Sequence, residues 1–177
     1  LFNSVIAYFN AATGAQVEFT GGDGFEQRVM IDVEAGSPPG IAVVRAMPNT
    51  PAQVGRGVTA CVANAATSAA QKAMATELLS AVGEVVWLDR ESDMDAVTAV
   101  SGSGPAYIFL VAECLAQAGR AAGLSPELAA SLARATVAGA GELLHRSELD
   151  AATLRTNVTS PGGTTAAALD VLMAKPG

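Results

Sequence analysis

A stretch near the carboxyl end of the chain combines hydroxyl side chains, a proline and paired glycines directly before a helical pattern. Residues 157–165 are NVTSPGGTT, and apolar residues follow at helical spacing. Pro161 forces Ser160 out of helical geometry, and glycine permits a positive φ. Since the first N–H groups of a helix lack internal partners, the pattern predicts a cradle of backbone donors and hydroxyls for a small carboxylate or phosphate. A well-capped turn between two helices would have the same pattern.

Two further stretches place polar groups or glycines at the ends of expected elements. Residues 45–51 follow a strand and hold Asn49 and Thr50 between two prolines. Ligands of open α/β sheets bind beyond the carboxyl ends of strands, although such a loop can also simply end an edge strand. The glycines of residues 101–107 allow either ligand approach or close helix contact, and the second use is commoner.

Other reactive side chains are weaker candidates. His145 lies at an expected helix end and is paired with no Ser or Cys by a recognisable motif. Cys61 and Cys114 sit in apolar surroundings without metal-ligand spacing, so we expect two buried, reduced thiols and no metal. Residues 91–95 are acidic and are expected to be solvated at a helix start. Residues 21–24 are glycine-rich but are not a dinucleotide-binding fingerprint.

The elements that position these stretches are of two kinds. Short β-branched runs predict strands at residues 41–45, 58–62 and 84–88, and a further strand is indicated near residues 16–19. The last two of the three runs flank a helix that begins at Ser68, where Gln71 completes a capping box. Gly83 follows the helix at a position that suits a left-handed residue. The pattern is typical of the edge of an α/β sheet.

After residue 89 the pattern becomes helical. Ser103 as N-cap and Pro105 in the first turn are expected to open a helix to about residue 123, apolar on every face except one narrow polar stripe. A second long helix is expected from Ser125 to about His145. We therefore predict an α/β part at residues 1–89 and an all-helical part at residues 90–177. Since the first of these helices should be buried nearly all round, an obligate oligomer is expected.

The composition excludes some classes of function. Ten Lys and Arg face 17 Asp and Glu, for a net charge of −7, and no basic cluster is present, so a nucleic-acid partner is not expected. The apolar run of residues 105–112 ends at Glu113, so no membrane span is expected. The 37 alanines suit close helix packing. Without a secretory signal in residues 1–10, a cytoplasmic protein is predicted.

Three segments together, at residues 43–57, 96–119 and 154–172, resemble pyrroline-5-carboxylate reductase in its order and spacing. The resemblance implies an oxidoreductase of proline biosynthesis that reduces 1-pyrroline-5-carboxylate to L-proline. The cofactor would be NADPH or NADH, with NADPH favoured. It also implies an N-terminal Rossmann domain, incomplete here, and a helical domain that forms a homodimer and in some members a decamer.

The same resemblance implies the residues of a site. The catalytic candidate is Thr165, whose hydroxyl would reach the ring nitrogen. Substrate-binding residues surround it in one turn: Asn157, Val158, Ser160, Gly162, Gly163, Thr164 and Thr165. The nicotinamide end of the cofactor would be lined by residues of two turns: Met47, Pro48, Asn49, Thr50, Gly104 and Pro105. Glu148 is a candidate contributor from a second subunit.

The sequence departs from the family's pattern at its N-terminal end. Residues 1–40 lack a glycine-rich nucleotide-binding turn, so the cofactor phosphates can be placed on no residue, and the chain is expected to be a part of a longer one. Two alternatives stay open: a non-catalytic helical oligomerisation module with an anion site, and a related small hydroxy-acid dehydrogenase. A hydroxy-acid dehydrogenase would normally have a Lys or His beside the hydride acceptor.

Overall fold

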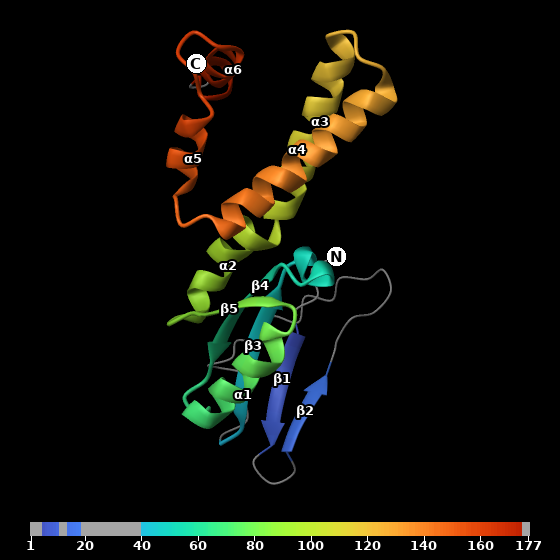
Figure 1. Ribbon diagram of the computed structural model, residues 1–177. Helices are drawn as coiled ribbons and strands as arrows, with labels where there is room; N and C mark the ends of the chain where they lie inside the picture. Colours follow the sequence, from blue (N-terminus) through green and yellow to red (C-terminus); the bar gives the residue numbers. More distant parts are fainter. Residues whose placement is uncertain (1–4, 11–13, 19–39, 175–177) are drawn as a thin grey trace. The chain divides into compact units, whose positions relative to one another are not determined.

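The chain forms two compact units, Leu1–Tyr107 and Ile108–Gly177, in the computed structural model (Figure 1). The structure describes residues 5–10, 14–18 and 40–174. The first unit is built on a sheet and the second on helices, which confirms an α/β part followed by an all-helical part. The division between compact units falls inside a long helix, so the proposed domain boundary at residues 89 and 90 stays a prediction.

Five strands form one sheet in the order β2-β1-β3-β4-β5. Among the described strands, β4 and β5 run parallel, and each other neighbouring pair is antiparallel. The strands are β1 (Val5–Asn10), β2 (Gly14–Glu18), β3 (Ala42–Pro48), β4 (Gly57–Ala63) and β5 (Gly83–Trp87). The three predicted strands are confirmed as β3, β4 and β5. The strand near residues 16–19 overlaps β2, with Phe19 outside the described residues, and β1 was not predicted.

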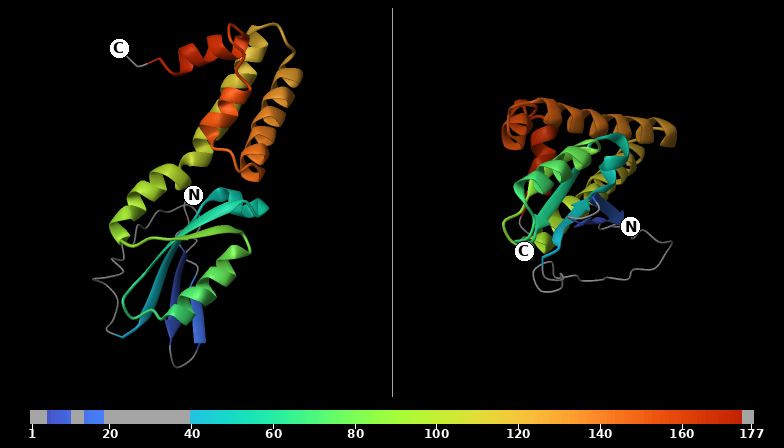
Figure 2. Two further views of the ribbon diagram at one scale, coloured as in Figure 1. Left: turned by 60° about the vertical axis from the view of Figure 1, so that its left-hand side comes forward. Right: turned by 90° about the horizontal axis from the view of Figure 1, so that it is seen from below.

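Helix α1 (Ala69–Ser80) connects the two parallel strands and covers one face of the sheet (Figure 2). The predicted capping box is present at its start. The Ser68 hydroxyl accepts from the Gln71 N–H at 3.3 Å, and the Gln71 Oε1 accepts from the Ser68 N–H at 2.8 Å. Each bond satisfies a donor that the first turn would otherwise leave unpaired, so the helix start is fixed locally.

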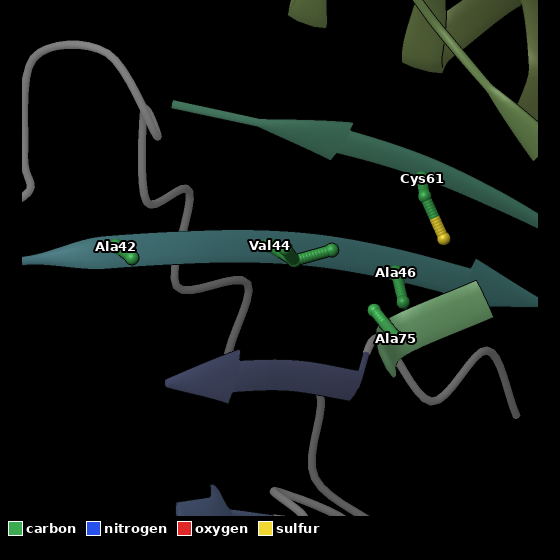
Figure 3. Packing of buried hydrophobic residues seen from close by; sticks show 5 residues of the cluster. All are labelled: Ala42, Val44, Ala46, Cys61 and Ala75. Carbon is green, nitrogen blue, oxygen red and sulfur yellow. The ribbon is translucent and has the colours of Figure 1, made fainter. Parts of the chain in front are cut away.

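The two faces of β3 carry different apolar contacts because successive side chains of a strand alternate between faces. Val44 and Ala46 pack with Cys61 of β4 and Ala75 of α1 (Figure 3). Met47, on the other face, packs with a cluster formed by Ala60, Val62 and Met94. Both faces of β3 are therefore covered, up to the end of the strand, where Asn49 follows.

The two cysteines differ in their surroundings. Cys61 is fully buried, and burial raises the pKa of its thiol to about 12. Cys114 is exposed in the single chain, so the prediction that both thiols are buried is wrong for this residue. The reason is that the helix carrying Cys114 has an apolar surface which this chain does not cover.

Gly83 has a different use from the predicted left-handed helix end. The C-cap of α1 is Ala81 in right-handed geometry, whereas Gly83 begins β5 with φ of +146°. A Cβ at residue 83 would lie 2.0 Å from the carbonyl oxygen of Gly57, its partner on β4. Glycine is therefore required here because two strands approach closely, and not because a helix ends.

The substitution Gly83→Ala is expected to lower the free energy of unfolding by about 3 kcal/mol, through the clash with Gly57 in addition to backbone strain. Urea unfolding monitored by circular dichroism measures it. Gly40→Ala is the matched control, since Gly40 has φ of +83° with nothing within 4 Å of its built Cβ. The Gly40→Ala variant should lose only about 1–2 kcal/mol of the free energy of unfolding, because it adds backbone strain without a clash. Equal losses for the two variants would contradict the close approach of β4 and β5.

The helical segment after β5 has no break at Ser103. It contains η2 (Glu91–Asp93), α2 (Met94–Val97), a π-helical turn η3 (Thr98–Gly102) and α3 (Gly104–Ala121). Ser103 has helical dihedrals and its N–H donates to Thr98 O, five residues back, at 2.8 Å. The prediction that Ser103 is an N-cap is wrong, because the chain enters Pro105 from a wide helical turn.

The second unit continues from α3 into α4 (Pro126–Arg146), α5 (Ala151–Asn157) and α6 (Thr164–Leu172). The predicted start of the second long helix is confirmed, with the Ser125 hydroxyl accepting from the Leu128 N–H at 3.2 Å. A Cβ at Gly119 would lie 3.1 Å from that of Ala129, so small residues let α3 and α4 approach closely.

Helix α3 exposes the apolar surface that was expected to be buried nearly all round. None of its residues is buried in this chain. The side chains from Tyr107 to Val111 are each exposed by 49–62%. Consecutive residues of a helix point in different directions, so no single neighbour within the chain could cover them. The expectation that this helix is buried nearly all round is therefore wrong for a single chain.

The helical segment Glu91–Ala121 is also long and apolar enough to cross a membrane by length and composition, with a mean hydropathy of 1.3 over its best window. Only 6% of that window is buried in this chain. Apolar helices of soluble proteins that are covered by their neighbours pass the same test. The prediction that the chain has no membrane span therefore stays a prediction.

Candidate functional site

The predicted substrate-binding residues lie in the turn between α5 and α6 and in the adjoining ends of these two helices. Helix α5 is capped by Asp150, whose Oδ1 accepts from the Thr153 N–H at 2.8 Å. Hydrogen bonds from Thr153 lower the pKa of Asp150 below its ordinary value, so the cap stays charged near neutral pH. Asn157 ends α5, and Val158 follows as an exposed C-cap. The start and end of α5 are thus fixed by its own local bonds.

The glycines of this turn have two distinct uses. Gly162 has φ of +69°, in the left-handed region that favours glycine. The Gly163 N–H donates to Ser160 O at 3.1 Å, and a Cβ at Gly163 would lie 3.2 Å from the same oxygen. The turn is therefore tight, and it leads the backbone directly into α6.

Helix α6 begins behind this turn without a capping side chain. Gly163 is its N-cap, in extended geometry, and makes no side-chain cap. The N–H groups of Thr164 and Thr165 lie in the first turn, where a helix offers no internal acceptor. Because the Gly163 N–H is already bonded to Ser160, these two amides are the stronger backbone donors for an anion. The partial positive charge of the helix end favours a carboxylate there.

Hydroxyl groups surround the same helix start. Ser160 and Thr164 are exposed, whereas Thr165 is half-buried. The hydroxyl of Thr159 differs from these because it donates to Arg155 O at 2.7 Å within the chain. The predicted site residues of the second unit are therefore neighbours in sequence around one helix start, where amides and hydroxyls occur together.

The end of β3 and the start of η1 hold four of the six residues predicted at the cofactor. Met47 is buried, Pro48 and Asn49 are half-buried, and Thr50 is exposed at the start of η1 (Thr50–Val54). The Asn49 Oδ1 accepts from the Val58 N–H at 2.9 Å, and its Nδ2 donates to Ser101 O at 3.1 Å. The carboxamide of Asn49 is thus bonded at both ends to the protein.

The turn that opens α3 holds the other two predicted residues. Gly104 and Pro105 are half-buried, and a Cβ at Gly104 would meet nothing within 4 Å. The bond from Asn49 to Ser101 joins this turn to the loop after β3 within the first unit. The predicted cofactor residues therefore share one unit, and the predicted substrate residues lie in the other.

These residues fit the nicotinamide end of a dinucleotide. The exposed Thr50 hydroxyl and the open space above Gly104 suit a flat ring with a polar amide, whereas Met47 is buried in the core cluster. Within residues 40–174, no glycine-rich strand-to-helix turn for the phosphates occurs. In the same ranges, no group of three or more His, Cys, Asp or Glu is placed to hold a metal ion.

An ion pair between β3 and η2 was missed by the sequence reasoning. The Arg45 guanidinium donates to Glu91 Oε1 at 2.7 Å, with the two side chains 22% and 16% exposed. Glu91 was expected to be solvated, and this is wrong because η2 lies against the sheet. No local pattern signals a pair 46 residues apart in the chain.

A family profile described as pyrroline-5-carboxylate reductase dimerisation matches residues 91–176. Residues 91–176 are therefore similar to this family. The match covers the helices that carry the α5–α6 turn and the exposed surface of α3. A dimerisation family supports oligomerisation through these helices, and the resemblance stated from the three sequence segments is confirmed.

Curated pyrroline-5-carboxylate reductases extend the match into the sheet. The protein of Pseudomonas aeruginosa is 54% identical over 127 residues, which are 72% of this chain and 46% of that relative. The protein of Synechocystis is 52% identical over 134 residues, covering 76% of this chain and 50% of the relative. The chain thus spans about half the length of the curated relatives it matches.

Solved pyrroline-5-carboxylate reductases share the fold. The structure from Coxiella burnetii matches with a TM-score of 0.73 at 44% identity, over 76% of this chain and 50% of that one. A structure from Plasmodium falciparum, which has NADP bound, matches with a TM-score of 0.64 at 38% identity, over 73% of this chain and 52% of that one.

Proposed function

We propose that this chain is the sheet edge and helical part of a pyrroline-5-carboxylate reductase. The reaction reduces the C=N bond of 1-pyrroline-5-carboxylate to give L-proline, the last step of proline biosynthesis. The observation that carries this function is the α5–α6 turn. The start of α6 has no capping side chain, it follows Gly162 in left-handed geometry, and hydroxyl side chains lie beside it. These features suit a small ring that carries one carboxylate.

The substrate carboxylate is assigned to the α5–α6 turn. Ser160, Gly162, Gly163 and Thr164 bind it through backbone groups and hydroxyls, while Asn157 and Val158 shape the approach. The net charge of −7 makes a local positive helix end important, because the rest of the chain repels an anionic substrate.

Thr165 is the proposed catalytic residue. Its half-buried hydroxyl follows Thr164 in the first turn of α6, next to the carboxylate cradle. There it hydrogen-bonds the ring nitrogen, directly or through a water, and helps to hold or deliver the proton that this nitrogen needs. A hydroxyl is a weak acid, so orientation and electrostatic stabilisation supply most of the rate enhancement.

The cofactor is assigned to the first unit. Bound NADPH or NADH supplies the hydride, with NADPH favoured, and a relative from Plasmodium falciparum has NADP bound. The loop residues Met47, Pro48, Asn49 and Thr50 line its nicotinamide end together with Gly104 and Pro105. These groups bind and orient the ring and exclude water from it.

The proposed assembly is a homodimer through residues 90–177, with residues 1–89 as the incomplete nucleotide-binding part. The exposed surface of α3 and the dimerisation family both support it. Glu148 is the proposed contribution from the second subunit, and association of dimers into a decamer is the finer proposal. The partners are a small imino acid and a second copy, with neither nucleic acid nor membrane, in the cytoplasm.

A steady-state assay tests the function. The full-length protein that contains this chain is mixed with 1-pyrroline-5-carboxylate and either NADPH or NADH, and absorbance at the reduced nicotinamide band is followed. Substrate-dependent oxidation of at least one cofactor is expected. Its absence with both cofactors, from a folded dimer, would contradict the reductase and leave the non-catalytic module.

A further inference from the structure

The helical segment before α3 has an acceptor that its own helix cannot satisfy. In an α-helix the carbonyl of Ser101 would accept from the N–H of residue 105, four positions later. That residue is Pro105, which has no N–H. The next N–H along the chain, that of Ala106, donates to Ser103 O at 3.0 Å. Proline therefore deprives Ser101 of its ordinary helical partner.

The π-helical turn η3 lies directly before this proline. A proline ring inside a helix clashes with the carbonyl four residues earlier, which here is again that of Ser101. The Ser103 N–H reaches back five residues to Thr98 O at 2.8 Å, so the turn is wider than α-helical geometry. This widening moves the carbonyl aside and directs it toward a group outside the helix.

Asn49 supplies the missing donor. Its Nδ2 donates to Ser101 O at 3.1 Å, across 52 residues of sequence. Its Oδ1 is held at the same time by the Val58 N–H at 2.9 Å, so the carboxamide is fixed from both sides. The end of β3 beside Asn49 is well packed, because Met47 and Met94 belong to one buried cluster.

We propose that Asn49 is a positioning residue, which replaces the N–H absent from Pro105 and thereby fixes the Gly104–Pro105 turn against the nicotinamide end of the site. The catalytic consequence of this inference rests on the proposed function. The hydrogen bond between Asn49 and Ser101 is independent of that function. A misplacement of about 1 Å at a reacting centre can cost on the order of 100-fold in rate. A bond that fixes one wall of that centre therefore affects the chemical step.

The variant Asn49→Asp isolates the proposed bond. The aspartate keeps an oxygen for the Val58 N–H but has no N–H for Ser101, and its charge repels that carbonyl. In the full-length dimer, kcat is expected to fall about 10- to 100-fold, with the KM for 1-pyrroline-5-carboxylate changed less than about 3-fold. The primary isotope effect with 4-deuterated NADPH should rise, because hydride transfer becomes more rate-limiting.

Pro105→Ala provides a specific rescue. It restores an N–H four residues after Ser101, so the helix can satisfy this carbonyl without Asn49. In the Pro105→Ala background, Asn49→Asp is expected to cost less than about 3-fold in kcat. Amide hydrogen exchange over residues 98–107, measured without cofactor, should speed up in Asn49→Asp and slow again in the double variant.

Asn64→Asp is the matched control. Asn64 makes a similar pair of bonds at the other end of β3, accepting from the Val43 N–H at 3.1 Å and donating to Ile41 O at 2.8 Å. The Asn64→Asp substitution should leave kcat and the isotope effect unchanged. An active wild type whose Asn49→Asp variant keeps wild-type kcat, isotope effect and exchange overturns the positioning role alone. A wild type that oxidises neither cofactor overturns the proposed function and the catalytic consequence together.

Discussion

Replacing Thr165 with alanine is expected to lower kcat/KM for 1-pyrroline-5-carboxylate by about 10- to 1,000-fold, the range typical of a lost transition-state hydrogen bond. Thr165 lies in the first turn of α6, at the helix end that is assigned to the substrate carboxylate. The loss should fall mainly on kcat, with little change in NADPH affinity, because the cofactor is assigned to the other unit. Steady-state kinetics and a fluorescence titration with NADPH measure the two quantities.

Two further variants make the Thr165 result specific. Thr165→Ser keeps a hydroxyl and is expected to retain most of the activity. Thr156→Ala removes a hydroxyl from α5 that donates to Ala152 O at 2.9 Å within the same helix, and it should behave as wild type. If Thr165→Ala keeps the wild-type kcat/KM, Thr165 has no part in the mechanism.

A charge in the exposed apolar surface of α3 is expected to dissociate the oligomer. Phe109 is 62% exposed in the single chain, and covering a phenylalanine contributes roughly 1.5–3 kcal/mol. Phe109→Glu loses this contribution and adds the cost of burying a carboxylate, so dimer affinity should fall by at least about 100-fold. Sedimentation equilibrium at micromolar concentration measures this change.

Gln117→Glu is the control for this prediction because Gln117 forms the polar stripe of α3 together with Glu113 and Arg120. It adds the same charge to the same helix and should leave the dimer intact. Activity is expected to fall with the dimer in Phe109→Glu, since the site is proposed to be completed by a second subunit. A wild type that sediments as a monomer, or a Phe109→Glu dimer of wild-type affinity, would contradict the use of this surface.

Local chemistry made much of the fold predictable. The capping box of Ser68 and Gln71, the cap at Ser125 and the β-branched runs of β3 to β5 each determine an element from a few neighbouring residues. The α5–α6 turn was predictable for the same reason, because its proline and glycines act on their own backbone. Strand β1 was missed although β2 follows it closely; its other partner, β3, is distant in sequence.

Local sequence patterns could not predict contacts between segments that are distant in the chain. Ser103 has the residue type of a cap, yet its helical dihedrals depend on the turn forced by Pro105. Asn49 was correctly singled out as a polar residue after a strand, but its two bonds join segments far apart in sequence. Cys114 was expected to be buried because its neighbours are apolar, and one chain alone does not cover them.

Hydride transfer from the cofactor to 1-pyrroline-5-carboxylate is tested most directly by following the hydride with an isotopic label. The full-length protein is incubated with 1-pyrroline-5-carboxylate and NADPH that carries two deuterium atoms at the nicotinamide C4, and the product is analysed by mass spectrometry. We expect L-proline with one deuterium, on the ring carbon that was the imine carbon. A folded dimer that forms no proline, or forms only unlabelled proline, would contradict this expectation.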